Sequence, residues 1–261
     1  MMIFSKDIKE FTKNWKSAIS QSIKDSGINP ALGIIKVGYN EASERYVRNK
    51  IKDCKEVGIF VMGQELTEDS TTEDLINSIN NLATLCDGIL VQLPLPEGIS
   101  LEKVKNAIPA DKDVDGFKLD SHFNPCTPLG IIKYLDYCDF DLDGKNVTIL
   151  GRSDIVGRPL ARMMTDRNAT VTLCHSRTKN YYQFVQTADL IVSAVGKANF
   201  LNCYPIHVPV VDVGINFVDG KLVGDCCNTE CRDVTSVPGG VGLLTRCALL
   251  ENVCRAAEII N

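Results

Sequence analysis

The chain has 261 residues, of which 44% are hydrophobic and 23% are charged. This ordinary globular composition excludes a disordered chain, a collagen and a coiled-coil rod, and the length predicts one or two domains. Twenty-eight Lys and Arg against 33 Asp and Glu give a net charge of −5, which argues against a broad nucleic-acid-binding surface. No apolar stretch reaches the length of a membrane span, and charges near the N-terminus interrupt any signal-peptide core. We therefore expect a cytoplasmic protein without nucleic-acid or membrane partners.

Helical periodicity and apolar runs alternate along the first half of the chain. The pattern predicts helices over 5–25, 42–57 and 73–84, and strands over 31–38, 59–66 and 87–96. Gly58 is the expected stop of the second helix, and Thr71 or Thr72 the expected N-cap of the third. Strands separated by helices predict a parallel sheet covered by helices.

A candidate linker between two lobes follows the third predicted strand. Residues 109–128 contain three prolines and many charged and turn-forming residues. Beyond it, the alternation predicts helices near 129–137, 157–167, 180–187 and 243–260, and strands over 146–151, 169–174, 189–196, 209–214 and 221–226. The sequence thus predicts an α/β protein of two lobes joined near 118–128.

In the second lobe, the turn GRSDIVGRP (151–159) lies between a predicted strand and a predicted helix. A doubly wound fold binds a dinucleotide at such a turn. The match to G-x-G-x-x-G is imperfect, because Ser153 and Val156 occupy the second and third glycine positions and Gly157 comes one residue late. The motif alone leaves a plain strand–turn–helix connection equally open.

The next predicted strand ends in the turn CHSRT (174–178), with no acid to bind a ribose 2′-hydroxyl. A basic, hydroxyl-rich turn suits a 2′-phosphate, so the turn favours NADP over NAD. The alternative for Arg177 is a solvated loop cation, and we expect His175 to be a loop histidine rather than a catalytic base. Because ligands bind at the carboxyl ends of parallel strands, we expect Gly151, Ser176, Gly196 and Ile215 to line one crevice.

In the first lobe, Tyr46 and Lys50 lie four residues apart, on one face of a predicted helix. Such a pair fits a surface contact or a phenol that orients a catalytic amine. A lysine base needs its pKa lowered from about 10.4 towards 7–8, usually by burial. Gln92 is the polar side chain of the apolar run ILVQLPLP, and it is either a site residue or an amide that hydrogen-bonds to the backbone. Asp115 is either a site residue or a turn residue.

Two further features carry weaker signals. The stretch PGGVG (238–242) lacks the GK[ST] of a P-loop, and we read it as backbone that allows a flat ligand to approach closely. The eleven cysteines include no CxxC pair and are typical of small buried residues in a reducing compartment. Cys226, Cys227 and Cys231 form a cluster without a nearby fourth ligand, so we expect no metal site.

Nine stretches in this order resemble one family, methylenetetrahydrofolate dehydrogenase/methenyltetrahydrofolate cyclohydrolase. They are VGYNEASERYVRNKIKDCKEVGI, DGILVQLPLP, PADKDVDGF, PCTPLG, GRSDIVGRPLARMM, VTLCHSRT, ADLIVSAVG, VVDVGIN and PGGVGLLT, and they span residues 37 to 245. The resemblance implies NADP-dependent oxidation of 5,10-methylenetetrahydrofolate and hydrolysis of the methenyl product to 10-formyltetrahydrofolate, in one inter-lobe cleft.

The resemblance also implies roles for individual residues. Lys50 matches the catalytic lysine, Tyr46 the tyrosine that stacks on the folate, Gln92 the glutamine that holds the lysine, and Asp115 the acid that binds the pterin. The folate-binding set further contains Val91, Leu93, Pro238, Gly239, Gly240, Val241 and Gly242. The set expected to bind NADP contains Gly151, Arg152, Ser153, Val156, Gly157, His175, Ser176, Arg177, Gly196 and Ile215.

By the same resemblance, residues 1–124 and 242–261 form the catalytic, folate-binding domain, and 125–241 form a Rossmann-like NADP-binding domain with a doubly wound parallel sheet. The resemblance further implies that the C-terminal helix returns to the first lobe and that the protein is a homodimer. Two departures from the family concern the cleft. The segment 118–124 is shorter than usual, and Leu243 replaces a proline suited to the first position of a helix.

Other functions fit parts of this pattern. A dehydrogenase with weak or absent cyclohydrolase activity, or one that prefers NAD, is the nearest alternative. A two-lobed NADP enzyme that reduces a shikimate-like keto acid would leave VQLPLP and PGGVG unexplained. A catalytically silent nucleotide-binding regulator is expected to lack Lys50 or Asp115, and both are present.

Overall fold

The computed structural model describes residues 4, 6–201, 206–226 and 233–261, with only the backbone of Ala42. The chain divides into two compact units. The first unit contains Asn14–Cys126 and Arg246–Asn261, and the second contains Met1–Lys13 and Thr127–Thr245. Helices α1 (Ile8–Ser26) and α8 (Val241–Ala256) each contribute residues to both units.

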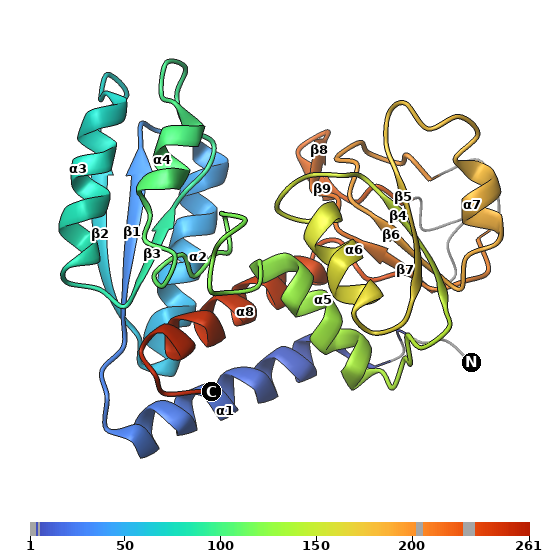
Figure 1. Ribbon diagram of the computed structural model, residues 1–261, viewed down its shortest axis with the longest axis horizontal. Coiled ribbons are helices and arrows are strands. Elements are labelled where there is room, and N and C mark those ends of the chain that lie inside the picture. Colours follow the sequence, from blue (N-terminus) through green and yellow to red (C-terminus); the bar gives the residue numbers. More distant parts are fainter. Residues whose placement is uncertain (1–3, 5, 202–205, 227–232) are drawn as a thin grey trace. The chain divides into compact units, whose positions relative to one another are not determined.

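The first unit is built on a parallel sheet in the order β2-β1-β3. Its strands are β1 (Ala31–Val37), β2 (Phe60–Leu66) and β3 (Gly88–Val91), and its other helices are α2 (Glu41–Val57), α3 (Thr72–Ala83) and α4 (Leu101–Ala107). Apolar side chains of β1 and β3 pack against α3 and α4, which lie side by side in Figure 1. The switch point, where β1 has β2 on one side and β3 on the other, places the ends of β1 and β3 together.

Local signals define the helix ends in this unit. The Asn40 side chain accepts the N–H of Ser43 at the start of α2, and Gly58 ends that helix with a φ of 100°. Thr71 and Asp74 form a capping box at the start of α3. The predicted stop at Gly58 and the predicted threonine cap are therefore confirmed.

One prediction in this unit was wrong in extent, and one helix was not predicted. The third strand ends at Val91 rather than at 96, because Pro94 and Pro96 have no N–H to offer a neighbouring strand. Helix α4, which Ser100 caps, was not predicted, because its seven residues are too short for a periodic pattern.

The second unit is built on a parallel sheet in the order β5-β4-β6-β7. Its strands are β4 (Asn146–Leu150), β5 (Thr170–Cys174), β6 (Leu190–Ser193) and β7 (Val210–Asp212). Its other helices are α5 (Cys126–Tyr137), α6 (Gly157–Thr165) and α7 (Tyr182–Gln186). Side chains of α5, α6, β4 and β6 share one apolar core, and Figure 1 shows α5 and α6 side by side. The switch point of this sheet lies between β4 and β6.

The strand predicted over 221–226 is half of a hairpin. Strand β9 (Lys221–Val223) pairs antiparallel with β8 (Asn216–Val218), which was not predicted. Asp219 and Gly220 join them with φ values of 50° and 73°. This two-residue Asp-Gly turn is typical of a hairpin, a signal that the sequence reading overlooked.

Two α/β units with parallel sheets confirm the predicted fold class. The division into a folate-binding and an NADP-binding domain at the predicted boundaries stays a prediction, and in the structure residues 6–13 group with the second unit. Ile8 lies in the core of that unit, and the hydroxyl of Tyr134 donates to the carbonyl of Lys6 over 2.7 Å. In the described part of the chain, none of the helices has both the length and the apolar character needed to cross a membrane.

Candidate active site

Lys50 and Gln92 are in direct contact in the first unit. Lys50 lies on the third turn of α2, and Gln92 follows the end of β3. The Lys50 Nζ donates to the Gln92 Oε1 over 3.1 Å. The Gln92 Nε2 donates to the carbonyl of Leu93 over 2.7 Å, which fixes which end of the amide faces the lysine. Val91 is buried in β3, so Val91, Gln92 and Leu93 lie together at the carboxyl end of the sheet.

Tyr46 lies one turn before Lys50 on the same helix and is half-buried. Burial raises the pKa of its phenol, while the positive charges of Arg45 and Arg246 act in the opposite direction. The phenol is therefore neutral at physiological pH, as a ring that packs on a flat ligand should be.

The charges of Asp115 and Lys50 act in opposite directions on the buried thiol of Cys126. The thiol is fully buried, and burial, followed by the charge of Asp115 and a hydrogen bond to it, raises the pKa of Cys126 well above its ordinary value. The charge of Lys50 lowers the same pKa. The structure thus shows a direct contact between Lys50 and Gln92, and a shared site with Asp115 stays a prediction.

The short segment after Asp115 is an ordered loop. The buried carboxylate of Asp113 accepts the N–H of Phe117 over 3.0 Å and that of Lys118 over 2.8 Å. Burial raises the pKa of Asp113, and these N–H donors oppose the rise. The Ser121 hydroxyl donates to the carbonyl of Asp113 over 3.0 Å. The sequence reading missed Asp113, although the spacing of the two acids in KDVDG marks one of them as a turn anchor.

In the second unit, two glycines of the turn after β4 have no room for a side chain. Gly151 has a φ of 118°, and a Cβ there would lie 2.3 Å from the carbonyl oxygen of Ala194, which follows β6. A Cβ on Gly157 would lie 2.1 Å from the carbonyl oxygen of Gly151. The turn therefore passes close to the end of β6 and to the start of α6, at the switch point. Exposed backbone at such a turn suits a pyrophosphate.

Ser153 orders the turn that enters α6. Its Oγ accepts the N–H of Val156 over 3.2 Å and that of Gly157 over 3.5 Å. Arg152 and Ser153 are exposed, and Arg158 forms an ion pair with Asp154 at 3.3 Å. Ser153, which occupies the second glycine position of the imperfect motif, therefore has a structural role: it orders this turn.

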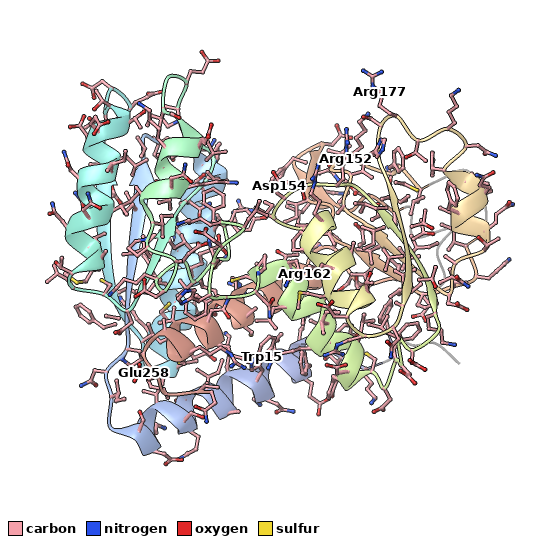
Figure 2. The ribbon with its side chains drawn as sticks, viewed as in Figure 1. Trp15, Arg152, Asp154, Arg162, Arg177 and Glu258 are labelled. Carbon is pink, nitrogen blue, oxygen red and sulfur yellow. The ribbon has the colours of Figure 1, made fainter. Side chains whose placement is uncertain are left out.

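The CHSRT turn is closed by its own hydrogen bonds. The N–H of His175 donates to the Thr178 hydroxyl over 2.9 Å, and the His175 Nδ1 accepts the N–H of Arg177 over 3.1 Å. The imidazole is therefore part of the turn. Ser176 and Arg177 are exposed, and Figure 2 shows Arg177 projecting into solvent at the end of the unit where Arg152 also lies.

Asp225 holds the loop after β6. This fully buried carboxylate accepts the N–H groups of Val195, Gly196 and Lys197 over 2.7, 3.1 and 2.9 Å. Ile215, two residues after Val213 in the next strand-end turn, is exposed. The sequence reading missed Asp225. Its signal was an acid inside an otherwise apolar strand prediction over 221–226.

The PGGVG stretch lies at the start of α8, in the second unit. Gly239 has a φ of 97°, and a Cβ on Gly240 would lie 2.2 Å from the carbonyl oxygen of Ser236. Pro238 and Gly242 are exposed, and Val241 is buried. The helix begins at Val241 rather than at 243 as predicted, so Leu243 is its third residue, and its N–H donates to Gly240 over 2.9 Å. A proline at this position could not make that bond.

Cys227 and Cys231 lie outside the described residues, so the predicted absence of a metal site at their cluster stays a prediction. Elsewhere in the described chain, no group of three or more His, Cys, Asp or Glu side chains is arranged to hold a metal ion. Cys226 itself is buried in the core of the second unit.

Comparison with known proteins identifies both parts of the chain. The family model described as the catalytic domain of tetrahydrofolate dehydrogenase/cyclohydrolase matches residues 5–115. The model described as the NAD(P)-binding domain of the same family matches residues 125–261. The "Bifunctional protein FolD" of Halalkalibacterium halodurans is 43% identical over 93% of this chain and 93% of its own.

Solved structures give the same result. The bifunctional FolD methylenetetrahydrofolate dehydrogenase/cyclohydrolase of Campylobacter jejuni is similar with a TM-score of 0.90 and 40% identity over 96% of each chain. The dehydrogenase-cyclohydrolase of Trypanosoma brucei, complexed with NADP and an inhibitor, is similar with a TM-score of 0.87 and 29% identity, covering 97% of this chain and 96% of that one.

Proposed function

The chain belongs to the tetrahydrofolate dehydrogenase/cyclohydrolase family, and on this premise we propose that it catalyses two consecutive reactions on one folate. It oxidises 5,10-methylenetetrahydrofolate to the methenyl form with NADP, and it hydrolyses the methenyl form to 10-formyltetrahydrofolate. The observation that carries the proposal is the 3.1 Å contact of the Lys50 Nζ with an amide whose own orientation is fixed. Relatives named as bifunctional support both activities.

The first reaction needs the nucleotide to be held in a defined orientation. Gly151 and Gly157 allow the turn to pack tightly against the Ala194 carbonyl and against its own backbone at the switch point. A tight turn at the start of a helix suits a pyrophosphate. When bound, NADP accepts a hydride from the methylene carbon of the folate. Asp225 keeps the Val195–Lys197 backbone in place beside the glycine turn, and Ser153 orders the start of α6.

The second reaction starts from a methenyl carbon that is already electrophilic. Water adds to this carbon and loses a proton, and the bond from the carbon to one ring nitrogen then breaks as that nitrogen gains a proton. We assign the handling of these protons to Lys50, whose Nζ lies 3.1 Å from the Gln92 amide oxygen. As the neutral amine it takes the proton that the water loses, and as the ammonium it returns that proton to the ring nitrogen. Gln92 limits the rotation of the lysine and thereby aims it.

The remaining residues bind the substrate. The Asp115 side chain accepts two N–H donors of the pterin through its two oxygens. Tyr46 supplies a neutral, half-buried ring for stacking. Val91, Leu93 and the stretch Pro238–Gly242 supply backbone and apolar contacts to the folate.

NADP is preferred over NAD because of the CHSRT turn. Ser176 and Arg177 are exposed on it, and no acid is present there to repel a 2′-phosphate. Arg152, Val156, His175, Gly196 and Ile215 complete the proposed cofactor set. The 2′-phosphate would thus meet one full positive charge and one hydroxyl.

The experiment is a continuous optical assay of purified protein with 5,10-methylenetetrahydrofolate, with NADP and NAD in separate cuvettes. Reduction of NADP at a higher kcat/KM than NAD supports the dehydrogenase and its cofactor. No reduction with either nucleotide would overturn it. NADP reduction with accumulating methenyltetrahydrofolate would favour the alternative of a dehydrogenase with weak cyclohydrolase activity.

The homodimer stays a prediction from the family resemblance, and the cytoplasmic location stays a prediction from the charged N-terminus and the lack of a long apolar stretch. Sedimentation equilibrium of the pure protein tests the first, because a dimer has twice the 28.7 kDa mass of the chain. Fractionation of cells that express the natural chain tests the second.

A further inference from the structure

We propose that Asn252, on α8, is a positioning residue that fixes Asp115 by clamping the two ends of the loop 114–124. The inference rests on the proposed function, because it concerns a residue assigned to bind the pterin. Nothing in the sequence pattern marked Asn252, which lies on the buried face of a helix among apolar side chains.

The side chain of Asn252 is 1% exposed and uses both hydrogens of its amide nitrogen. The Nδ2 donates to the carbonyl of Val114 over 2.8 Å and to that of Asn124 over 3.0 Å. Val114 immediately precedes Asp115, and Asn124 precedes the proline that leads into α5. One amide thus joins the beginning and the end of the loop.

Cys126 adds two further hydrogen bonds to the same part of the loop. Its Sγ donates to the carbonyl of Val114 over 3.3 Å, and its N–H donates to the carbonyl of Asp115 over 3.3 Å. The Asn252 Nδ2 lies 3.7 Å from the same sulfur. The carbonyl groups on both sides of the Asp115 Cα are therefore held by groups outside the loop.

The shortness of segment 118–124 makes this clamp effective. The ends of the loop already meet at Gly116, where a Cβ would lie 2.5 Å from the backbone of Pro125. Removal of the amide takes this donor from the Asn124 carbonyl and leaves the buried Val114 carbonyl with only the weak thiol donor of Cys126, so the loop is held less firmly. A shift of about 1 Å at a binding carboxylate is enough to cost about 100-fold in rate.

The test compares Asn252→Ala with Glu251→Ala, its neighbour on α8. Glu251 is also buried and accepts the indole N–H of Trp15 over 2.8 Å, so its loss removes a buried hydrogen bond without touching the loop. We expect Asn252→Ala to lower kcat/KM for 5,10-methylenetetrahydrofolate by about 10- to 100-fold with KM for NADP unchanged. We expect Glu251→Ala to lower the melting temperature without this effect. Equal losses of kcat/KM in the two variants would overturn the inference.

A double-mutant cycle with Asp115→Asn separates positioning from general damage. If Asn252 acts through Asp115, Asn252→Ala has little further effect in the Asp115→Asn background. The same fold loss in both backgrounds would contradict the proposal. Should Asn252→Ala fail to fold, Asn252→Ser, which keeps one donor, is expected to give a smaller loss of the same kind.

Amide hydrogen exchange tests whether Asn252 clamps the loop even if the protein lacks the proposed activity. An inactive wild-type protein would refute the proposed function, but Asn252→Ala should still accelerate amide exchange within residues 113–126 and leave α3 unchanged. Unaltered exchange in 113–126 would refute the clamp.

Discussion

Lys50 is the residue on which the proposed hydrolysis depends most. We expect Lys50→Met to lower the cyclohydrolase kcat by about 100-fold or more, because acid–base groups contribute about 10²–10⁴-fold. Folate binding should be largely retained, since Asp115 and Tyr46 remain. Hydrolysis of methenyltetrahydrofolate, followed by its absorbance, measures the loss. Lys52→Met, an exposed lysine on the same helix, is the control, and an undiminished rate in Lys50→Met would remove Lys50 from the mechanism.

Arg177 governs cofactor choice in this account. Arg177→Ala should reduce the preference for NADP over NAD by about 10- to 100-fold, because a hydrogen bond to a charged group contributes about 1.5–3 kcal/mol. The ratio of kcat/KM for the two nucleotides is the measurement. Arg162→Ala removes an exposed arginine of α6 (Figure 2) and should leave the ratio unchanged. An unchanged ratio in Arg177→Ala would refute its role.

The sequence predicted the candidate residues whose side chains have recognisable chemistry. It did not predict the buried polar residues that hold the loops through hydrogen bonds to the backbone. Lys50 and Gln92 were proposed, and the structure joins them. Asp113, Asp225 and Asn252 were not proposed, because the signals of the two acids in the sequence are weak and Asn252 gives none. Their partners are backbone N–H and C=O groups, which become visible only once the loops are folded.

At the scale of single elements, the start of α6 gives the sharpest test of the glycine turn. Gly157→Ala places a Cβ 2.1 Å from the carbonyl oxygen of Gly151, so the turn must shift. Such overpacking costs about 1–3 kcal/mol in the free energy of unfolding. Chemical denaturation measures this cost, and the stabilisation by added NADP should shrink as well.

Gly63→Ala in β2 is the matched control, because nothing lies within 4 Å of its added Cβ. It should neither destabilise the protein to a similar degree nor alter the effect of NADP. If Gly157→Ala retained full stability and full stabilisation by NADP, the tight turn would not be the nucleotide site.

Elements with strong local signals were predicted well, and those decided by their neighbours were not. The caps of α2 and α3 follow from single residues. The end of β3 depends on which strand is available to pair, and α4 depends on packing against α3. The apolar composition after β3 continues to Pro96 and therefore does not mark the end of the strand. Helix α4 has only seven residues, which are too few for a periodic pattern.

For the molecule as a whole, buried thiols predict a loss of stability at alkaline pH. Burial raises the pKa of Cys54, Cys247 and Cys254 to about 12, from an ordinary value of 9.0. Because the folded pKa is the higher one, stability is fully present below pH 9 and is lost as the pH rises towards 12. Each thiol lowers the free energy of unfolding by up to about 1.4 kcal/mol for each pH unit between pH 9 and pH 12. Urea unfolding at pH 8 and pH 10.5 measures the slope.

Lysine and tyrosine side chains also titrate in this range, so the slope needs a control. Cys254→Ala removes one thiol, and its slope should be lower than that of the natural protein by up to one proton. An identical slope in Cys254→Ala would contradict the assignment to this thiol. The same thiol should resist alkylation in the native state at pH 8, because it is protonated and buried.

The central claim is that one chain performs both reactions, and product stoichiometry tests it most directly. Protein is mixed with 5,10-methylenetetrahydrofolate and excess NADP, and NADPH, methenyltetrahydrofolate and 10-formyltetrahydrofolate are quantified over the same time course. The account predicts that 10-formyltetrahydrofolate rises in step with NADPH, well above the rate of hydrolysis in a matched sample without protein. Methenyltetrahydrofolate that accumulates in step with NADPH, with hydrolysis no faster than in that sample, would contradict it.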